Sequence, residues 1–382
     1  MVNSDLYISL MKLNEICEVY SGYAIKEFNN IKKGLPVIKI GNILTDGTLN
    51  LGECKFSTED INEKYHSKKG DIYVALSGAT TGKLGIMEDE KKYIINQRVG
   101  IIRLKQKSVS QSYIKFFLLK QTERIIDEAT GCAQPNISPK QIGEYDVPVF
   151  SEKEMLQISD ILNNIVCVIK HYKAMIKKYD DLIKARFIEM FGDPVADTKN
   201  WGQTLLKEHL ESIKYGTSTP PIFTDDGYAF IRATNIKNGK IVTNDMKYIP
   251  QEEADRLEKC KLSGGEIIIV RSGVNAGDTC IVTDEYIGQY AGYDMILVLS
   301  SDLHPVFFNT LINTEYMDKV VKPLTRRAAQ PHLNSEQTQR LPIIEVPFEL
   351  QEQFADFVKQ VDKSRFDIKK SIIELEREVV YD

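Results

Sequence analysis

The glycine-rich stretch SGATTGKLG, residues 77 to 85, contains residue types that could bind a phosphate group. A loop that binds and hydrolyses nucleotides has four residues between its first glycine and the Gly-Lys pair, and a serine or threonine after the lysine. Here only three residues separate Gly78 from Gly82, and Leu84 follows Lys83. We therefore interpret the stretch as a glycine turn between two strands, which leaves room for a phosphate contact but not for nucleotide hydrolysis.

Other catalytic and metal-binding patterns are missing from the sequence. The six cysteines form no CxxC pair and the five histidines do not cluster at ligand spacings, so we expect no metal site and interpret the cysteines as buried free thiols. The stretch STPPIF (218 to 223) superficially resembles the Asn/Asp-Pro-Pro-aromatic loop of amino-methyltransferases, but Thr219 and Ile222 stand where that chemistry requires a polar amide or acid and an aromatic ring. The sequence therefore predicts a non-catalytic chain.

Residues of the kind that hydrogen-bond to base edges and phosphates flank several predicted turns and strand ends. These candidates are Lys68, Lys69, Lys83, Arg232, Arg271, Arg326 and Arg327. For each of them a solvated surface charge is the alternative role. The net charge of −5 argues against binding a polyanion over the whole surface, so contacts to nucleic acid would have to use local basic patches.

The elements that would position these residues occur twice in the chain. The stretch GCAQPNISPKQI (131 to 142) resembles RAAQPHLNSEQT (327 to 338), and Gln134 and Gln330 lie 196 residues apart. Two further pairs of stretches, 35 to 49 with 228 to 241 and 68 to 87 with 263 to 282, match at offsets of 193 and 195 residues and have the alternation and Gly turns of short strands. The sequence therefore predicts two copies of one β-rich domain.

Each copy continues with an amphipathic helix candidate (110 to 126 and 305 to 321), then the Gln-Pro motif, then a proline-containing extended run. The residues of the motif stand at matched places ahead of a long helix. We expect them to anchor each domain at its junction with that helix, more than to read bases. These junction residues are Gln134, Pro135, Asn136, Gln330, Pro331 and His332.

Apolar residues after each motif recur at alternating spacings of three and four, which is typical of a coiled-coil seam. The first helix is predicted to place Ile158, Leu162, Ile165, Ile169, Tyr172 and Ile176 in this seam, and the second Phe354, Val358, Val361, Ile368, Ile372 and Leu375. Only Arg365 interrupts the second series. Two amphipathic helices packed on an ordinary core are the alternative interpretation.

These patterns predict an α+β fold in which two β-rich domains are joined by two long antiparallel coiled-coil helices, with internal duplication and pseudo-twofold symmetry. The expected boundaries are 1–150 for the first domain, 151–190 for the first helix, 191–202 for a linker, 203–347 for the second domain and 348–382 for the second helix. No apolar run reaches the roughly 18 residues of a membrane span, and the start lacks the layout of a signal peptide. We therefore expect a cytoplasmic protein without a membrane partner.

The order of these features resembles the specificity subunit of type I restriction-modification systems. The junctions ARFIEMFGDP (185 to 194) and KYGTSTPP (214 to 221) add to the resemblance, which covers essentially the whole chain. In that family the two β-rich domains are target recognition domains that read the two halves of a bipartite, asymmetric target in double-stranded DNA, and the helices form a spacer.

The resemblance also implies what the chain works with. Two methyltransferase (modification) subunits would bind S-adenosylmethionine and methylate adenine, and a restriction translocase subunit would join them for cleavage, so that this chain itself holds no cofactor. The alternative function is a protein-binding scaffold with two β-rich heads on a coiled-coil spacer that does not touch DNA.

Overall fold

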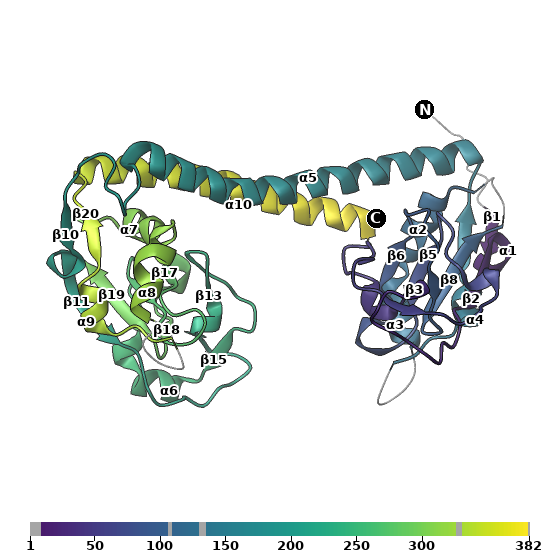
Figure 1. The fold of residues 1–382 in the computed structure, drawn as a ribbon, viewed down its shortest axis with the longest axis horizontal. Coiled ribbons are helices and arrows are strands. Elements are labelled where there is room, and N and C mark those ends of the chain that lie inside the picture. The colour runs from purple at the N-terminus through teal and green to yellow at the C-terminus, as the bar shows by residue number, and fades with distance from the viewer. Residues whose placement is uncertain (1–8, 106–108, 130–134, 326–330, 381–382) are drawn as a thin grey trace. The chain divides into compact units, whose positions relative to one another are not determined.

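The computed structural model describes residues 9–105, 109–129, 135–325 and 331–380. The chain divides into two units: unit 1 comprises the residues up to Lys173 together with those from Lys370 onward, and unit 2 comprises Ala174–Lys369. Each unit contains a β-rich domain and part of two long helices (Figure 1). The β-rich domains share one plan.

The centre of unit 1 is a four-stranded antiparallel sheet in the order β2-β8-β5-β6. Its strands are β2 (Cys17–Ser21), β8 (Val99–Leu104), β5 (Ile72–Ala75) and β6 (Leu84–Ile86). A second sheet has the order β4-β3-β7, with β4 (Lys55–Ser57), β3 (Leu35–Ile38) and β7 (Ile94–Ile95), and β1 (Ser9–Lys12) pairs with β9 (Asp146–Val149).

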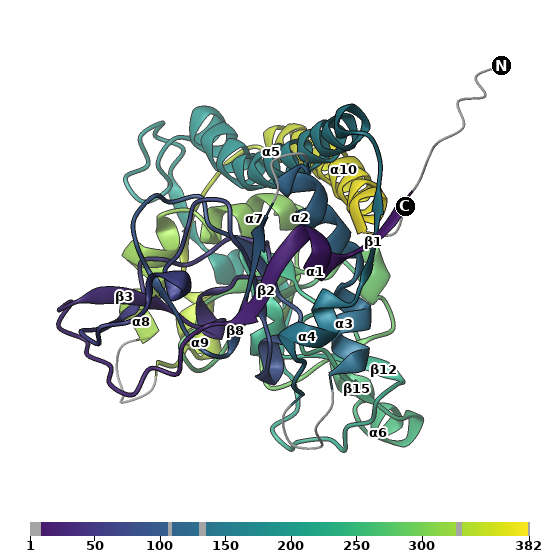
Figure 2. The ribbon, with the colours of Figure 1, turned by 90° about the vertical axis from the view of Figure 1, so that its right-hand side faces the viewer.

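Strand β5 is buried on both faces, which explains its unbroken apolar run. Ile72 and Val74 pack on one side against apolar residues of the short helices, whereas Tyr73 and Ala75 pack on the other side with residues such as Ile38. The helices are α1 (Leu13–Ile16), α2 (Gln111–Lys120), α3 (Thr122–Glu128) and α4 (Pro139–Gly143), which gather beside β2 and β8 (Figure 2).

Unit 2 repeats the arrangement with the sheet order β11-β19-β16-β17. These strands are β11 (Leu210–Tyr215), β19 (Met295–Leu299), β16 (Ile267–Ile269) and β17 (Thr279–Ile281). The pairing Ile72↔Ile102 of unit 1 recurs as Ile267↔Leu297, 195 residues later on both strands. The repeat seen in the sequence is therefore a repeat of strand order and register.

The remaining elements of unit 2 follow the same plan with additions. Its strands include β15 (Lys247–Ile249), β12 (Tyr228–Ile231) and β18 (Tyr290–Ala291) in one sheet, β10 (Gln203–Leu205) paired with β20 (Pro342–Ile344), and the hairpin of β13 (Ile236–Lys237) and β14 (Lys240–Ile241). Its short helices are α6 (Gln251–Arg256), α7 (Pro305–Ile312), α8 (Lys322–Thr325) and α9 (Ser335–Gln339).

The helices predicted over 110–126 and 305–321 are interrupted in the structure. The first breaks at Gln121 into α2 and α3, and the second ends at Ile312 and resumes as a π-helical turn, Met317–Val321. The side-chain amide of Asn313 donates to the carbonyl oxygen of Asn309 (2.8 Å) and to the hydroxyl of Thr279 (2.9 Å). Polar side chains that bond the local backbone end helices in this way, and an apolar pattern alone does not reveal it.

The two long helices are α5 (Glu152–Phe191) and α10 (Phe348–Val380). Ser151 and Glu154 form a reciprocal cap at the start of α5, with the Glu154 carboxylate accepting from the Ser151 N–H at 3.0 Å and the Ser151 hydroxyl accepting from the Glu154 N–H at 3.3 Å. Gly192, with φ of 78°, follows the last residue of α5 and lets the chain turn away.

Within unit 2 the two helices run antiparallel. Phe187 packs edge-on against Phe354 at 5.5 Å between ring centroids, and further along the pair the Asp180 carboxylate contacts Arg365 at 2.6 Å. In unit 1 the ammonium group of Lys173 lies 2.7 Å from the carboxylate of Glu376. Residues that come later in α10 contact residues that come earlier in α5. The two helices therefore run in opposite directions.

The structure places all the predicted seam residues on the less exposed side of each helix. Phe354, Val358, Val361 and Ile372 are buried, as is Ile169, and the other predicted seam residues are half-buried. Arg365, which interrupts the apolar series, is also buried, and its guanidinium bonds Asp180 and, at 2.8 Å, Asp362. An arginine fits this seam position because carboxylates from both helices receive it.

Candidate nucleic-acid interface

A glycine turn closes the end of β5 in unit 1. After Ala75 the chain passes through Leu76 and Ser77, turns between Gly78 and Gly82, and returns as β6. Both glycines have positive φ values, 81° and 84°. The stretch is thus a tight connection between neighbouring strands, and Lys83 lies half-buried at its end.

A segment from more than fifty residues later lies against this turn. The N–H of Ile137 donates to the carbonyl oxygen of Leu76 (2.9 Å), and the N–H of Gly78 donates to the carbonyl oxygen of Pro135 (3.0 Å). Ser77 and Asn136 therefore face each other as a one-residue antiparallel bridge. Pro135 and Asn136 of the Gln-Pro motif therefore lie beside the sheet.

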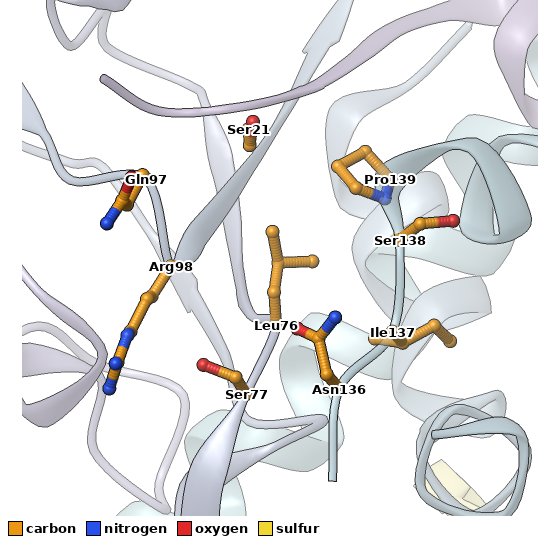
Figure 3. A pocket seen from close by; sticks show the side chains of 9 residues that line it. All are labelled: Ser21, Leu76, Ser77, Gln97, Arg98, Asn136, Ile137, Ser138 and Pro139. Atoms are coloured by element: carbon orange, nitrogen blue, oxygen red, sulfur yellow. The ribbon is translucent and has the colours of Figure 1, made fainter. Parts of the chain in front are cut away.

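The turn, this segment and the chain entering β8 enclose a hollow of about 460 Å³, which we call the unit 1 hollow (Figure 3). Its lining residues are Ser21, Leu76, Ser77, Gln97, Arg98, Asn136, Ile137, Ser138 and Pro139. In Figure 3 Ser77 and Arg98 lie on one side of the hollow and Ser138 and Pro139 on the other. Arg98 is the one ionisable side chain among them.

Several polar side chains of the unit 1 hollow have no partner among the described residues, although the Ser138 hydroxyl is bonded to Gln141. The Ser77 hydroxyl is buried, with 8% of the residue exposed, and has no partner. The side chains of Gln97, Arg98 and Asn136 are exposed and make no hydrogen bond or ion pair with any described residue. Buried polar groups in proteins are normally bonded, so an unpartnered hydroxyl beside an open hollow indicates a place for a polar ligand.

Unit 2 builds the same backbone at the equivalent place. The N–H of Leu333 donates to the carbonyl oxygen of Arg271 (2.8 Å) and the N–H of Gly273 to that of Pro331 (3.1 Å), so that Ser272 faces His332. These contacts repeat those of unit 1 at offsets of 195 and 196 residues. The backbone framework of the site is common to both domains.

The side chains around the shared serine differ between the units. In unit 2 the guanidinium of Arg271 lies 4.9 Å from the ring centroid of Tyr215, and the Tyr215 hydroxyl accepts from the N–H of Ser335 (2.8 Å). Ser272 and His332 bond each other through Oγ and Nδ1 at 2.9 Å. The counterparts of Ser77 and Asn136, whose side chains are open in unit 1, thus bond each other in unit 2.

A buried carboxylate supports the unit 2 arrangement. Asp294 is 3% exposed, and one of its oxygens accepts from the N–H of Arg271 at 2.9 Å while the other has no partner among the described residues. Burial raises the pKa of this carboxyl to about 6, and the N–H and the charge of Arg271 oppose that rise only in part. In unit 1 the equivalent N–H, that of Leu76, donates instead to the carbonyl oxygen of Arg98 (2.9 Å).

The structure separates the predicted DNA-binding candidates into different places. Lys83 and Arg271 lie at the turn ends described above. Lys68 and Lys69 precede β5 at its opposite end, where Lys69 pairs with Glu90 at 3.0 Å. Arg232 is half-buried and bound to the carboxylate of Asp245 at 3.0 Å and to its carbonyl oxygen at 2.6 Å. Arg326 and Arg327 lie outside the described residues, as do Gln134 and Gln330.

The junction residues that are described lie in the bodies of the domains. Pro135 and Asn136 contact the turn after β5, and Pro331 and His332 contact the turn after β16. Helix α4 and strand β9 follow before α5 begins, and α9 and β20 precede α10. Their anchoring role at the helix junction stays a prediction.

Sequence reasoning missed a second matched pair of groups. The ammonium of Lys39 lies 3.5 Å from the ring centroid of Phe28, and the guanidinium of Arg232 lies 5.9 Å from that of Phe223. Both rings are 38% exposed. The signal was present in the sequence, because the two aromatic residues lie 195 residues apart and the two cations 193 apart. A cation beside an exposed ring is an arrangement suited to contact with nucleic acid.

Neither a metal site nor a membrane helix is seen in the part of the chain that the structure describes. No group of three or more His, Cys, Asp or Glu side chains there could hold a metal ion. Among the same residues no helix is long and apolar enough to cross a bilayer.

Comparison with known proteins identifies relatives over most of the chain. The family model for the type I restriction modification DNA specificity domain matches residues 8–177 and again residues 200–377. The specificity subunit of the type I restriction enzyme EcoBI from Escherichia coli is 19% identical over 69% of this chain, and that of MjaVIII from Methanocaldococcus jannaschii is 21% identical over 79%. The matches span 60% and 74% of the lengths of those relatives.

Solved structures share the fold at low identity. The specificity (S) subunit from M. genitalium is 15% identical with a TM-score of 0.51, covering 99% of this chain and 96% of that one. A chain from a type I restriction-modification system, solved in work on its complex assembly and conformational transition, is 14% identical with a TM-score of 0.59, covering 98% of this chain and 96% of that one. The two matches to the family model cover most of the sequence and coincide with the internal repeat. The chain therefore belongs to the type I restriction-modification DNA specificity family and carries the domain of that family twice.

Proposed function

We propose that this chain is the specificity subunit of a type I restriction-modification complex and that it reads a bipartite, asymmetric sequence in double-stranded DNA. The observation that carries the proposal is the shared framework with different side chains. Ser77 and Ser272 stand at the same turn of the same backbone, yet their neighbours offer different hydrogen-bonding groups. Two domains that read different half-sites require this combination. The side chains recognise base edges and must differ, whereas the backbone that sets the domain architecture can stay the same.

The chemical steps belong to partner subunits in this proposal. Two methyltransferase subunits bind S-adenosylmethionine and methylate adenine at the site that this chain selects, and a restriction translocase subunit adds cleavage. The chain itself performs no catalysis and holds no cofactor. The named relatives are specificity subunits of restriction enzymes, which supports this division of roles.

The long helices offer apolar surface for such partners. Helix α5 exposes apolar residues at intervals of seven outside its seam, and α10 exposes two more at the same interval. These residues are Ile161, Val168, Met175 and Leu182 on α5, and Phe366 and Ile373 on α10. Repeated exposed apolar side chains on a helix favour protein contact, so we expect the partner subunits to use these faces.

Genome-wide mapping of adenine methylation tests the proposal. Cells that carry this chain with its cognate methyltransferase subunit are compared with cells that lack only this chain. The expected result is a two-part asymmetric motif that is methylated in the first cells and unmethylated in the second. Identical methylation in both, with both proteins stably expressed, would refute the proposal and favour a protein-binding scaffold.

A further inference from the structure

The unit 1 hollow has the groups of a purine-reading site. An arginine side chain reads guanine by donating two hydrogen bonds to O6 and N7, and the amides of asparagine and glutamine pair with adenine through N6 and N7. Arg98, Gln97 and Asn136 all line the hollow with their side chains free of described partners, and the buried Ser77 hydroxyl adds a further donor and acceptor. Among the described residues, no acidic side chain lines the hollow to neutralise Arg98.

The basic residues nominated from the sequence in unit 1 are less suited to this task. Lys69 is paired with Glu90, and Lys68 lies beside it at the far end of β5. A lysine ammonium is also a point charge that grips phosphates without the fixed fork that a guanidinium presents to a base edge. Arg98 is therefore the residue of unit 1 that combines a guanidinium group without an ion-pair partner and a position at the hollow.

We propose that the unit 1 hollow is where the first domain reads its half-site, with Arg98 determining specificity for one guanine and Gln97, Asn136 and Ser77 completing the contact. This inference rests on the proposed function and goes beyond it by assigning the base-reading residues of one domain. Unit 2 reads its half-site with other groups at the same place, because there Ser272 and His332 bond each other and Arg271 stacks on Tyr215.

The test compares Arg98→Ala with the unchanged chain in the complete complex, by methylation mapping in cells and by binding of the purified complex to duplex DNA. Loss of a two-bond contact to guanine lowers affinity for the cognate duplex by about tenfold to a hundredfold. Replacing that guanine in the duplex should then cost the unchanged complex the same factor and the Arg98→Ala complex almost nothing. In the mapped motif one guanine position loses definition, in one half-site only.

Arg124→Ala is the matched control. Arg124 is also an arginine of unit 1 with half of its side chain exposed, but it pairs with Glu128 and does not line the hollow. We expect its motif to equal that of the unchanged chain. Ser77→Ala adds a variant that separates reading from folding, since its hydroxyl bonds no described residue and its removal should change binding without lowering stability.

Each outcome decides the question. An unchanged motif for Arg98→Ala overturns the assignment. A loss of affinity that is equal for all sequences, with a shallower dependence on salt, makes Arg98 a phosphate contact and also overturns it. If the unchanged complex itself yields no two-part motif, the proposed function has failed together with this inference, whereas a two-part motif that ignores Arg98 defeats the inference alone.

Discussion

The Asp294 carboxyl provides a quantitative test of the structure, because its burial has a definite consequence for stability. Its pKa is about 6 in the folded chain against an ordinary value of 3.8. A raised carboxyl pKa means that the folded state holds the proton more tightly than the unfolded state. The stability from this group is therefore complete below about pH 4 and is lost as the pH rises through 6.

The magnitude follows from the size of the shift. About two pKa units at 1.36 kcal/mol each correspond to about 3 kcal/mol of unfolding free energy lost between pH 4 and pH 7. Asp294→Asn resembles the protonated carboxyl and can still accept from the N–H of Arg271. We expect the variant to match the unchanged chain near pH 4 and to exceed it by up to about 3 kcal/mol at pH 7.

Tryptophan fluorescence during urea unfolding measures this difference in the relevant unit. Trp201 is the one tryptophan of the sequence, and it packs against the core of unit 2 while its indole N–H donates to the carbonyl oxygen of Phe191 at 3.0 Å. Its signal therefore reports unfolding of unit 2. Asp225→Asn, at an exposed site in the same unit, should stay within about 0.5 kcal/mol of the unchanged chain at every pH.

A second substitution separates the burial of the charge from the hydrogen bond. Val99 occupies the equivalent position in unit 1, so Asp294→Val imports the unit 1 residue but removes the acceptor for the Arg271 N–H. We expect Asp294→Val to be less stable than Asp294→Asn by about 1–3 kcal/mol. If Asp294→Asn shows no gain at pH 7, or a gain that is equal at pH 4 and pH 7, the carboxyl carries no burial penalty and the reasoning is wrong.

Three further predictions concern the helices, the domain cores and the cysteines. Arg365→Leu should leave the urea midpoint of unit 2 unchanged or raise it. Leucine fits the apolar seam, and the carboxylates that bond Arg365 are about half exposed and can be hydrated. A loss of more than about 2 kcal/mol of unfolding free energy would contradict this. Tyr316→Phe should destabilise unit 2 by about 1 kcal/mol, because it removes the hydroxyl that donates to the carbonyl oxygen of Pro342 at 2.5 Å. An unchanged urea midpoint would show that this hydrogen bond adds no stability. Cys167 is exposed, whereas burial raises the pKa of the Cys17 thiol to about 12, so mass spectrometry after brief iodoacetamide treatment at pH 8 should find Cys167 modified before Cys17; equal rates would contradict the burial of Cys17.

The fold could be predicted from the sequence where the chain repeats itself. Matched glycine turns and apolar runs at offsets near 195 residues indicated two β-rich domains, and the structure and the family comparison confirm the fold class. The break at Asn313 could not be predicted from apolar periodicity, because it depends on a polar side chain that bonds nearby groups. The burial of Arg365 needed knowledge of which carboxylates lie opposite it.

The candidate site was harder to predict because it is assembled from distant segments. Gln97 and Arg98 belong to no recognisable motif, and they become part of a site only because β8 pairs with β5 and because residues 135–139 return to the end of β5. The sequence pointed instead to lysines beside glycine turns. Some of those charges are engaged in ion pairs that a sequence alone does not reveal, as the pairing of Lys69 with Glu90 shows.

The division of labour at this site explains how one framework can carry two specificities. The contacts that hold the returning segment in both units are backbone hydrogen bonds, from Ile137 to Leu76 in unit 1 and from Leu333 to Arg271 in unit 2, and unit 2 adds the side-chain contact of Ser272 with His332. The backbone framework therefore does not depend on which side chains the turn carries. They can differ without disturbing the sheet. In unit 1 the carbonyl oxygen of Arg98 accepts from the N–H of Leu76, whereas in unit 2 the Asp294 carboxylate accepts from the equivalent N–H of Arg271. This substitution buries a carboxylate, which lowers stability at neutral pH. The stability penalty of the difference between the two domains therefore lies at Asp294, where a buried side chain has taken over a backbone hydrogen bond.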